Sequence, residues 1–439
     1  MRIGIVGGGL LGTALAYFLS ETTSHHVTLL EQSASLGGLN DAVELDDGLS
    51  ISRYHHVLLP EDHAVRDLCA RLGLADELVF RPARTGFIHN GAFHSLNTLW
   101  DFLSFPPLSA RDRVRLANTI FQARRIRDWR ALDTVPVRDW LTQTGSQQTF
   151  TRIWAPLLEA KFDNQYDRIP ATYIWSWINR MMAARHAPHM KTMIGYLRGS
   201  HRALVEAMAN KITARGGTII TNSRVREIEI RGGQLGQVRT HNNLLHFDHV
   251  VAAVPTPTFA RLIPAADQAY LNQLDQSRYL GLVCPALVID RPLSGYWTLN
   301  ITDPSSPFSS VIEMPHPQDS RYYVVYLPKY TAPENDWMGV PDHDIREAWL
   351  IRLRQLFPSL RQEHIRHFVV NRSRYADPVH TLQPLERLLP LQTPYAGLLL
   401  ANISQVYPGL PTSENAILHA REVAHKIAAQ PVLQAEPAA

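Results

Sequence analysis

The sequence begins with a short apolar run that leads directly into closely spaced glycines. Residues 2–6 read RIGIV, a β-branched run typical of a buried parallel strand, and Gly7, Gly9 and Gly12 then form the pattern G-x-G-x-x-G. Residues 13–21, TALAYFLSE, have helical spacing, and residues 26–31, HVTLLE, predict a second strand. A strand, a glycine loop, a helix and a strand in this order predict the βαβ unit that binds a dinucleotide.

The residues of this unit have distinct predicted tasks. Gly7 permits a tight turn, Gly9 lets the backbone approach a pyrophosphate, and Gly12 lets the helix pack closely on the strand. The helix N-terminus then faces the phosphates, and Glu31, which ends the second strand, can accept hydrogen bonds from ribose hydroxyls. An acid at position 31 argues against a 2′-phosphate. The alternative is a glycine-rich turn that binds no ligand.

Length and composition limit the class of protein further. A chain of 439 residues is too long for one simple core, so we expect two or more folding units. The net charge of +3 is too small to argue for nucleic acid as a partner. The two cysteines, Cys69 and Cys284, fit neither a zinc spacing nor a disulfide framework, so we expect no metal site and a reducing, cytoplasmic location.

A second glycine pair gives the sequence a family resemblance. Glu31 and Gly37-Gly38 form the pattern E-x5-G-G, which resembles the FAD-binding flavoproteins of the amine oxidase, protoporphyrinogen oxidase and phytoene desaturase superfamily. The runs RYHH at residues 53–56 and YLPKY at residues 326–330 resemble a bacterial protoporphyrinogen-oxidase-like subgroup. The resemblance implies that the glycine pair lies against the FAD ribose and phosphates. Leu39 stands where relatives often carry a basic residue.

The resemblance covers nearly the whole chain. It implies an α/β fold in which a Rossmann-like FAD-binding domain is interleaved with a mixed α+β substrate domain that includes a helical lobe. The FAD-binding domain would comprise residues 1–95, 196–260 and 385–428, the substrate domain residues 96–195 and 261–384, and a disordered tail residues 429–439. The implied cofactor contacts are Gly7, Gly9, Leu10, Leu11, Gly12, Glu31, Gly37, Gly38, Leu39, Val225 and Asn402.

Cys284 lies in the apolar run YLGLVCPALVID, which predicts a buried strand. Amine oxidases of this superfamily carry a lysine on the corresponding strand, where it holds a water near flavin N5, and Cys284 falls at about that place. Two interpretations stay open: a cysteine that packs in the core, and a thiol on the substrate side of the flavin. The missing lysine argues against the usual arrangement for amine oxidation. Pro285 cannot donate to a strand ladder, which predicts a bulge or an edge there.

Other candidates for catalysis lie elsewhere in the chain. His55 and His56 follow a predicted hairpin, and alternation would direct one of them toward the flavin, where it could supply a proton or stabilise the anionic reduced form. The alternative is that both are structural. Four further candidates have apolar or aromatic neighbours and would either line a pocket or lie at a solvated edge: Lys161, Glu313, Lys329 and Tyr407.

These features predict an FAD-dependent oxidoreductase that takes a hydride from a C–H bond of an apolar or amphiphilic small molecule. One alternative is a redox-neutral flavoenzyme acting on a sugar nucleotide, similar to UDP-galactopyranose mutase, in which a diphosphate would meet Arg185, His186, His189 and Arg198. Another is a flavin-binding protein without turnover. The sequence leaves the oligomeric state open.

A basic segment also suggests a membrane partner. It is preceded by the apolar run LWDFLSFPPL, and a basic amphipathic helix beside such a run can rest on an anionic membrane surface. A solvated helix face is the alternative. No run reaches the roughly 18 apolar residues that span a bilayer. The segment contains seven arginines: Arg111, Arg113, Arg115, Arg124, Arg125, Arg127 and Arg130.

Overall fold

The protein is described here by a computed structural model that covers residues 1–89, 91–95, 101, 108–163, 165–186, 191–303, 305–317 and 319–429. The predicted tail, 429–439, lies outside this range except for its first residue. The predicted βαβ unit is present. It consists of β1 (Arg2–Val6), α1 (Leu10–Thr22) and β2 (His26–Leu30), and β1 pairs in parallel with β2.

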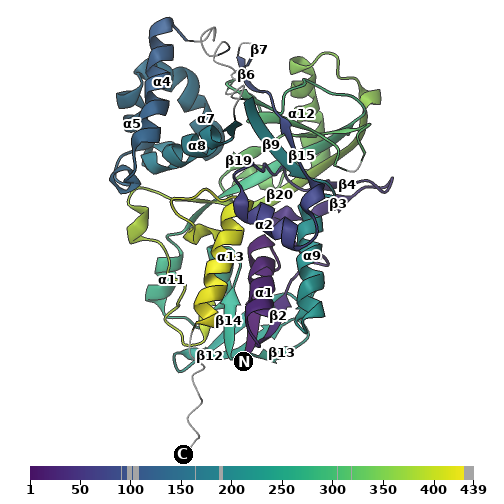
Figure 1. The fold of residues 1–439 in the computed structure, drawn as a ribbon, viewed down its shortest axis with the longest axis vertical. Coiled ribbons are helices and arrows are strands. Elements are labelled where there is room, and N and C mark those ends of the chain that lie inside the picture. Colours follow the sequence, from purple (N-terminus) through teal and green to yellow (C-terminus); the bar gives the residue numbers. More distant parts are fainter. Residues whose placement is uncertain are drawn as a thin grey trace, which may run out of the picture.

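A five-stranded parallel sheet forms the lower half of the molecule (Figure 1). Its order is β10-β2-β1-β14-β21, so segments that are distant in sequence meet beside β1. Because all strands run in the same direction, their carboxyl ends share one edge, which is where ligands bind in such sheets. The three added strands are β10 (Thr218–Ile220), β14 (His249–Ala252) and β21 (Leu398–Leu400).

Helix α1 is the centre of the core on one face of this sheet. Its residues from Leu10 to Leu19 are all buried, and it lies between α13 (Ser413–Ala428) and α9 (Ser200–Ala214) (Figure 1). A helix that is apolar on all sides can be stable only when neighbours cover every side. The sequence TALAYFLSE therefore requires this three-helix layer, which the carboxyl-terminal helix completes.

An eight-stranded mixed sheet forms a second layer. Its path is β19-β15-β18-β17-β16-β6-β7, and β20 pairs with the long central strand β15. Strands β6 and β7 belong to this sheet, although residues 1–95 were predicted as part of the FAD-binding domain. The strands are β6 (Thr85–His89), β7 (Ala92–Ser95), β15 (Arg278–Ile289), β16 (Thr298–Ile301), β17 (Ser310–Pro315), β18 (Tyr323–Tyr326), β19 (Lys329–Thr331) and β20 (Ile365–Val379).

The predicted helical lobe packs beside the second sheet (Figure 1). It has a core of its own, in which Trp140, Phe150 and Trp154 are buried. No residue between Ala110 and Ala183 that the structure describes belongs to one of the named strands. The lobe's main helices are α4 (Ala110–Arg125), α5 (Val137–Thr144), α7 (Ala155–Phe162) and α8 (Ala171–Ala183), with the short α6 (Gln147–Thr149) between them.

Smaller elements connect these layers. The predicted hairpin before His55 is formed by β3 (Ala42–Glu44) and β4 (Ser50–Ser52), and Val225 begins a three-stranded meander. The meander consists of β11 (Val225–Arg231), β12 (Gln234–Thr240) and β13 (Leu244–His246). The remaining strands and α-helices are β5 (Leu78–Pro82), β8 (Arg185–His186), β9 (Lys191–Leu197), α2 (His63–Arg71), α10 (Thr256–Leu262), α11 (Gln268–Leu274) and α12 (Asp342–Leu356).

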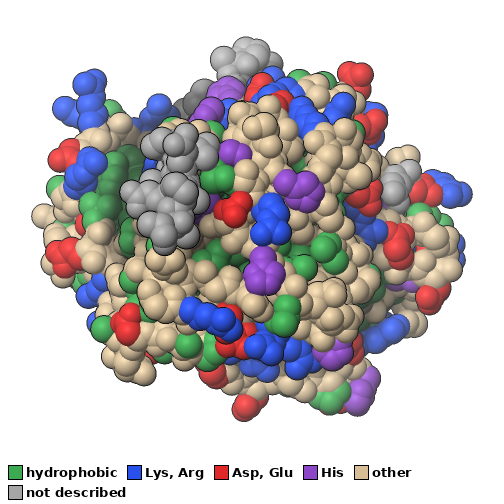
Figure 2. All heavy atoms as spheres, turned by 90° about the horizontal axis from the view of Figure 1, so that it is seen from below, with side chains coloured by type: hydrophobic (Ala, Val, Ile, Leu, Met, Phe, Trp, Pro, Cys, Tyr) green, Lys and Arg blue, Asp and Glu red, His purple; other side chains and the backbone are tan. Residues whose placement is uncertain are grey.

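The surface carries charges of both signs. Figure 2 shows the molecule from below Figure 1, and on this face basic, acidic and histidine side chains are interspersed. This mixture agrees with the small net charge of +3. Within the described ranges, no helix combines the length and the apolarity that crossing a bilayer requires.

Candidate active site

A cavity of about 1560 Å³ extends from the glycine loop at the end of β1 to the helices of the lobe. Gly7 and Gly9 line one part of it, and Trp154 and Tyr173 line another. The two sheets and the lobe therefore enclose one continuous space. Its position at the carboxyl end of the parallel sheet is the position expected from the βαβ unit.

The glycines at the β1 end of the cavity differ in what surrounds them. A Cβ added to Gly12 would lie 2.0 Å from the backbone oxygen of Gly7, so the helix could not approach the strand with any other residue there. A Cβ added to Gly9 would meet no atom within 4 Å, because Gly9 faces the open cavity. Gly37 N–H donates to the Gly8 oxygen at 2.8 Å, which brings the second glycine pair against the first loop.

The structure brings ten of the predicted cofactor contacts together around the cavity. Val225 is the exception: its side chain is buried at the start of β11 and is not among the lining residues. The chain two residues before Val225 does reach a cavity residue, because Ser223 N–H donates to the Glu31 backbone oxygen at 2.8 Å. The lining residues are Gly7, Gly9, Leu10, Leu11, Gly12, Glu31, Gly37, Gly38, Leu39 and Asn402.

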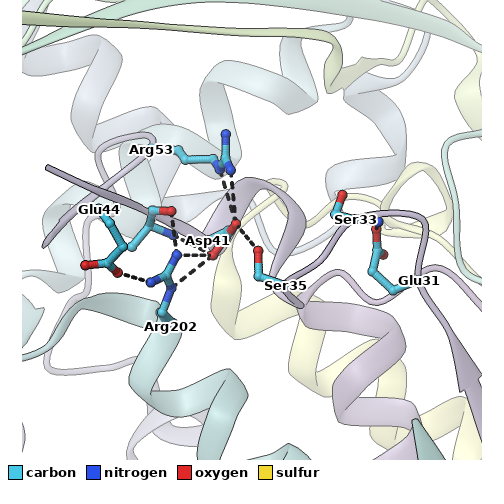
Figure 3. A network of polar contacts seen from close by, with 8 residues as sticks. Glu31, Ser33, Ser35, Asp41, Glu44, Arg53 and Arg202 are labelled. Atoms are coloured by element: carbon cyan, nitrogen blue, oxygen red, sulfur yellow. Dashed lines mark hydrogen bonds and ion pairs between the residues drawn. The ribbon is translucent and has the colours of Figure 1, made fainter. Parts of the chain in front are cut away.

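Glu31 and Asn402 both hold backbone in place at the edge of the sheet. The Glu31 carboxylate accepts from Gly8 N–H at 2.7 Å and from Ser33 N–H at 2.8 Å, and Figure 3 shows it beside Ser33. Asn402 Nδ2 donates to the Val254 oxygen at 2.9 Å, which links the residues after β21 to those after β14. Each oxygen of the Glu31 carboxylate can accept a further hydrogen bond.

His55 and His56 both contribute to the cavity lining, and the His56 ring also lies 4.5 Å from the His201 ring. The chain after β4 is irregular there and has no strand alternation. His56 Nε2 lies 3.0 Å from the Leu39 oxygen, whereas His55 Nδ1 is buried without a partner among the described residues. Burial lowers the pKa of His55 to about 3 and that of His56 to about 4. These shifts favour the neutral form of both rings in the protein without cofactor.

Lys161 is part of a polar cluster in the cavity wall. It forms an ion pair with Asp377, and its ammonium lies 3.6 Å from the centre of the Tyr330 ring. Burial alone would lower the pKa of Lys161, but Asp377 outweighs burial and the pKa is raised. Burial raises the pKa of Tyr173 in the same wall to about 12. The cluster is thus a charged but internally neutralised pair flanked by two protonated phenols.

Tyr407 forms a second polar site that also faces the cavity. Its hydroxyl donates to the buried carboxylate of Asp133, which also accepts from Thr172 Oγ1 at 2.7 Å. The His380 ring lies 5.0 Å from the Tyr407 ring, and burial lowers its pKa to about 4. Among the described residues, Asp133 Oδ2 and His380 Nε2 have no partner although both atoms are buried. This site can therefore accept and donate further hydrogen bonds.

Cys284 belongs to the core. Its side chain is fully buried, it is not among the lining residues, and burial raises the pKa of its thiol. The thiol therefore has neither the access nor the ionisation that the catalytic interpretation requires. Pro285 does not form the predicted bulge or edge. It lies where the partner of β15 changes from β19, paired with residues 281–283, to β18, paired with residues 286–289.

Glu313 and Lys329 also lie outside the residues that line the cavity. The buried carboxylate of Glu313 accepts from Leu293 N–H at 3.0 Å and from Ser294 N–H at 2.7 Å, so it closes a turn. The Lys329 ammonium lies 5.4 Å from the centre of the Trp337 ring, and burial lowers its pKa. Neither residue therefore borders this cavity.

Sequence reasoning missed the partners of the residues that it found. Asp377 is separated from Lys161 by 216 positions, and Asp133 is separated from Tyr407 by 274. Neither acid lies in a pattern that marks a site. Asp377 lies inside β20, directly before Pro378 and after several other polar residues of that strand, so its sequence neighbours do not single it out.

Comparisons with known proteins agree with this architecture. The family model for flavin containing amine oxidoreductases matches residues 12–428. The 15-cis-phytoene desaturase of Arabidopsis thaliana is 23% identical over 95% of this chain and 78% of its own length. That of Synechococcus elongatus is 24% identical over 82% of this chain and 80% of its own length.

Solved structures show the same fold at low sequence identity. A protein from Exiguobacterium sp. 255-15, provisionally named protoporphyrinogen oxidase, has a TM-score of 0.77 at 18% identity, covering 97% of this chain and 98% of that one. Putrescine oxidase bound to putrescine has a TM-score of 0.75 at 16% identity, covering 98% and 100%. Reduced UDP-galactopyranose mutase has a TM-score of 0.70 at 13% identity, covering 97% and 95%, which shows a shared fold alone.

The βαβ unit, the two glycine loops on one cavity and the family match over residues 12–428 support a single assignment. The predictions of an α/β FAD-binding fold, of FAD as the cofactor and of oxidoreductase activity are confirmed. The chain belongs to the family of flavin containing amine oxidoreductases and is an FAD-dependent oxidoreductase.

Proposed function

We propose that this enzyme oxidises or desaturates an apolar or amphiphilic small molecule held between the helical lobe and the eight-stranded sheet. Bound FAD would supply the acceptor for a hydride from a substrate C–H bond. The observation that carries the proposal is the cavity, which joins the glycine loops to a wall rich in aromatic and aliphatic side chains.

The residues at the glycine end fit FAD. Gly9 leaves open space where any side chain would protrude, and helix α1 begins directly after it at Leu10. Cavities of roughly 300–1,000 Å³ are typical for one small ligand, so a cavity of about 1560 Å³ has room for a cofactor and a substrate. We propose that the ten lining residues named above hold FAD, and that Val225 contributes backbone near the adenine.

A division of labour between the two halves follows from this placement. We propose that the part built on the five-stranded sheet binds FAD, and that the lobe and the eight-stranded sheet bind the substrate. In this proposal we keep the predicted domain boundaries, except that we assign residues 85–95, which contain β6 and β7, to the substrate part because both strands belong to the eight-stranded sheet.

The lining of the substrate part favours an apolar ligand. Ile120 of α4, Leu157 of α7 and Ile174 and Trp177 of α8 face the cavity. Removing such surface from water favours binding of hydrocarbon by about 25 cal/mol per Å². The desaturases among the relatives are named for 15-cis-phytoene, which is consistent with this class of substrate.

Two polar sites in this wall would orient the substrate. Because Asp377 already neutralises Lys161, the pair offers hydrogen bonds rather than a net charge, and it suits an uncharged polar group better than a carboxylate. Tyr407, which lines the cavity and donates its hydroxyl proton to Asp133, could accept a hydrogen bond from the substrate through its hydroxyl oxygen. His55, neutral at pH 7, could hold a hydrogen bond at its free Nδ1.

We also propose that helix α4 contacts a membrane surface through which an apolar substrate would arrive. Val114 and Phe121 are 71% and 55% exposed and lie on the same side of the helix, among the arginines of the basic segment. Leu116 and Ile120 of the same helix line the cavity. Sedimentation with anionic and with neutral vesicles tests this proposal. We expect the protein to bind anionic vesicles and the variants Val114→Ser and Phe121→Ser to bind them less. Equal binding to both kinds of vesicle, or equal binding by the variants and the wild type, would refute the proposal.

The sugar-nucleotide alternative receives no comparable support. Arg198 is exposed and is not among the lining residues. Arg185 and His186 form β8, but their side chains, like His189, lie outside what the structure describes.

The test is reduction of the bound flavin without oxygen. The FAD-loaded protein is mixed with apolar polyenes, amphiphilic alcohols and amines, and loss of flavin absorbance is followed. Ala117→Trp, which places a ring at the exposed rim of the cavity, should slow reduction by apolar substrates at least tenfold, whereas Val114→Trp on the outer face should not. Reduction by hydrophilic amines alone would overturn the apolar assignment, and turnover of UDP-sugars by the reduced enzyme would favour the redox-neutral alternative.

A further inference from the structure

A network of charged side chains lies beside the second glycine loop, which contains Gly37 and Gly38. Asp41 is buried between two arginines that come from different elements, as Figure 3 shows. Arg202 of α9 donates to Asp41 Oδ1 through Nε at 3.0 Å and Nη2 at 2.9 Å. Arg53, which follows β4, donates to Asp41 Oδ2 through Nε at 3.3 Å and Nη2 at 3.2 Å.

The two arginines differ in what remains for them to bind. The side chain of Arg202 is 21% exposed, also contacts Glu44 and donates to the Ala42 oxygen at 2.6 Å. Arg53 is 43% exposed, lines the cavity, and its Nη1 has no partner among the described residues. Arg202 therefore fixes Asp41, whereas Arg53 presents donors to the cavity.

The other cations that line the cavity each have their own carboxylate. Arg180 donates to both oxygens of the buried Asp62, at 2.6 and 2.9 Å, and Lys161 is paired with Asp377. Arg372 donates to Asp342 at 2.6 Å. Arg53 differs from them in sharing its carboxylate with a second arginine, Arg202, which pairs with Glu44 as well.

The position of Arg53 places it near the cofactor end. Its partner Asp41 follows the pair Gly37-Gly38 closely, and Gly37 bridges to Gly9 of the first loop. The position directly after the pair is Leu39, which brings no charge. FAD carries two phosphate charges, and its isoalloxazine ring gains negative charge when reduced, so a cation with free donors here meets an anion when FAD is bound.

We propose that Arg53 is an FAD-binding residue whose guanidinium donates to an oxyanion of the bound cofactor. The oxyanion is either the diphosphate or the N1–C2=O edge of the reduced ring. The inference rests on the proposed placement of FAD in this cavity. Asp41 orients the guanidinium by holding Nε and Nη2, which leaves Nη1 for the cofactor.

Titration of the apoprotein with FAD tests this assignment, with quenching of flavin fluorescence as the readout. If Arg53 meets the diphosphate, Arg53→Gln should raise the Kd of FAD roughly 10- to 100-fold, the usual effect of losing a hydrogen bond to a charged group. Arg53→Lys should recover part of the loss. Arg202→Gln is the matched control: it should lower the Tm of the apoprotein and change the Kd less than Arg53→Gln does.

Two further measurements distinguish the sources of the oxyanion. If Arg53 meets the diphosphate, Arg53→Gln also weakens competition by ADP and leaves the reduction potential of the bound flavin unchanged. If it meets the ring, the potential falls and ADP competes as before. The assignment would be overturned if Arg53→Gln left the Kd of FAD within twofold of the wild-type value and left the reduction potential of the bound flavin unchanged within experimental error. Failure of the wild-type protein to bind FAD would instead refute the proposed cofactor site.

Discussion

The ion pair between Lys161 and Asp377 offers the sharpest test of the cavity's energetics. The two side chains are only 21% and 13% exposed, and the lysine also lies against the Tyr330 ring. Removing one member of a fully buried pair costs about 3–5 kcal/mol, because the remaining charge stays desolvated. Asp377→Asn keeps one acceptor oxygen and the site borders a cavity, so we expect a loss of about 2–3 kcal/mol.

The expected shift in thermal unfolding follows from the length of the chain. Unfolding entropy is about 2.1 cal/mol/K per residue, so for 439 residues each kcal/mol moves the Tm by roughly 1 °C. Asp377→Asn should therefore lower the Tm by about 2–3 °C at pH 7 and fixed FAD concentration. Circular dichroism with replicate scans resolves such a shift.

Two comparisons make the result interpretable. Asp167 forms an ion pair with Arg138 at the surface, where the Asp167 side chain is 63% exposed and the Arg138 side chain is 48% exposed. Asp167→Asn should therefore change the Tm by less than about 0.5 °C. The double variant Lys161→Met with Asp377→Asn should lose less than the two single variants together, because neither charge is left alone. If Asp377→Asn behaves like Asp167→Asn, or if the single effects add, the reasoning about a coupled buried pair is refuted.

Three other predictions follow from the same geometry. Gly12→Ala should prevent stable folding, since its Cβ would lie 2.0 Å from a backbone oxygen. Gly9→Ala should leave the Tm of the apoprotein unchanged and reduce the FAD content of the purified protein, and equal effects of the two substitutions on both properties would contradict this. Cys284 should not react with a thiol reagent until the protein unfolds, and Cys284→Ala should still accept electrons from dithionite; a reactive native thiol at this position would revive its catalytic interpretation. Burial lowers the pKa of His56 to about 4, below its unfolded value of about 6.5, so its neutral form contributes stability above pH 6.5 that is lost as the pH falls toward 4, at up to about 1.4 kcal/mol per pH unit. His56→Gln should therefore show a smaller fall in Tm between pH 7 and pH 5 than the wild type, and identical falls would exclude a role for this ring.

Local patterns in the sequence predicted the cofactor half of the molecule well. The apolar run before Gly7, the loop and the helix beginning at Leu10 are contiguous, and their physical requirements are local: a buried strand, a turn and a close approach. The same reasoning placed Glu31 and the pair Gly37-Gly38 on the cavity. These residues could be found because spacing along the chain alone determines how they meet.

The substrate half could be predicted only in part. Lys161 and Tyr407 do reach the cavity, but an isolated polar residue among apolar neighbours also described Glu313, which closes a turn instead. Cys284 shows the same ambiguity, because a buried strand has the same apolar sequence whether or not its side chains border a cavity. Sequence alone does not tell which side of a doubly covered sheet is open.

The dinucleotide-binding βαβ unit and the second glycine loop can be recognised in the sequence, since each is specified within a short segment. Which charged side chains meet depends instead on how the layers pack. Arg53 and Arg202 share Asp41 because a hairpin and a helix from different parts of the chain converge on it. Lys161 pairs with Asp377 because a lobe helix packs against the second sheet. Such pairs are set by the packing of whole layers, and the hydrophobic burial that drives this packing is non-directional and leaves no mark at the paired positions.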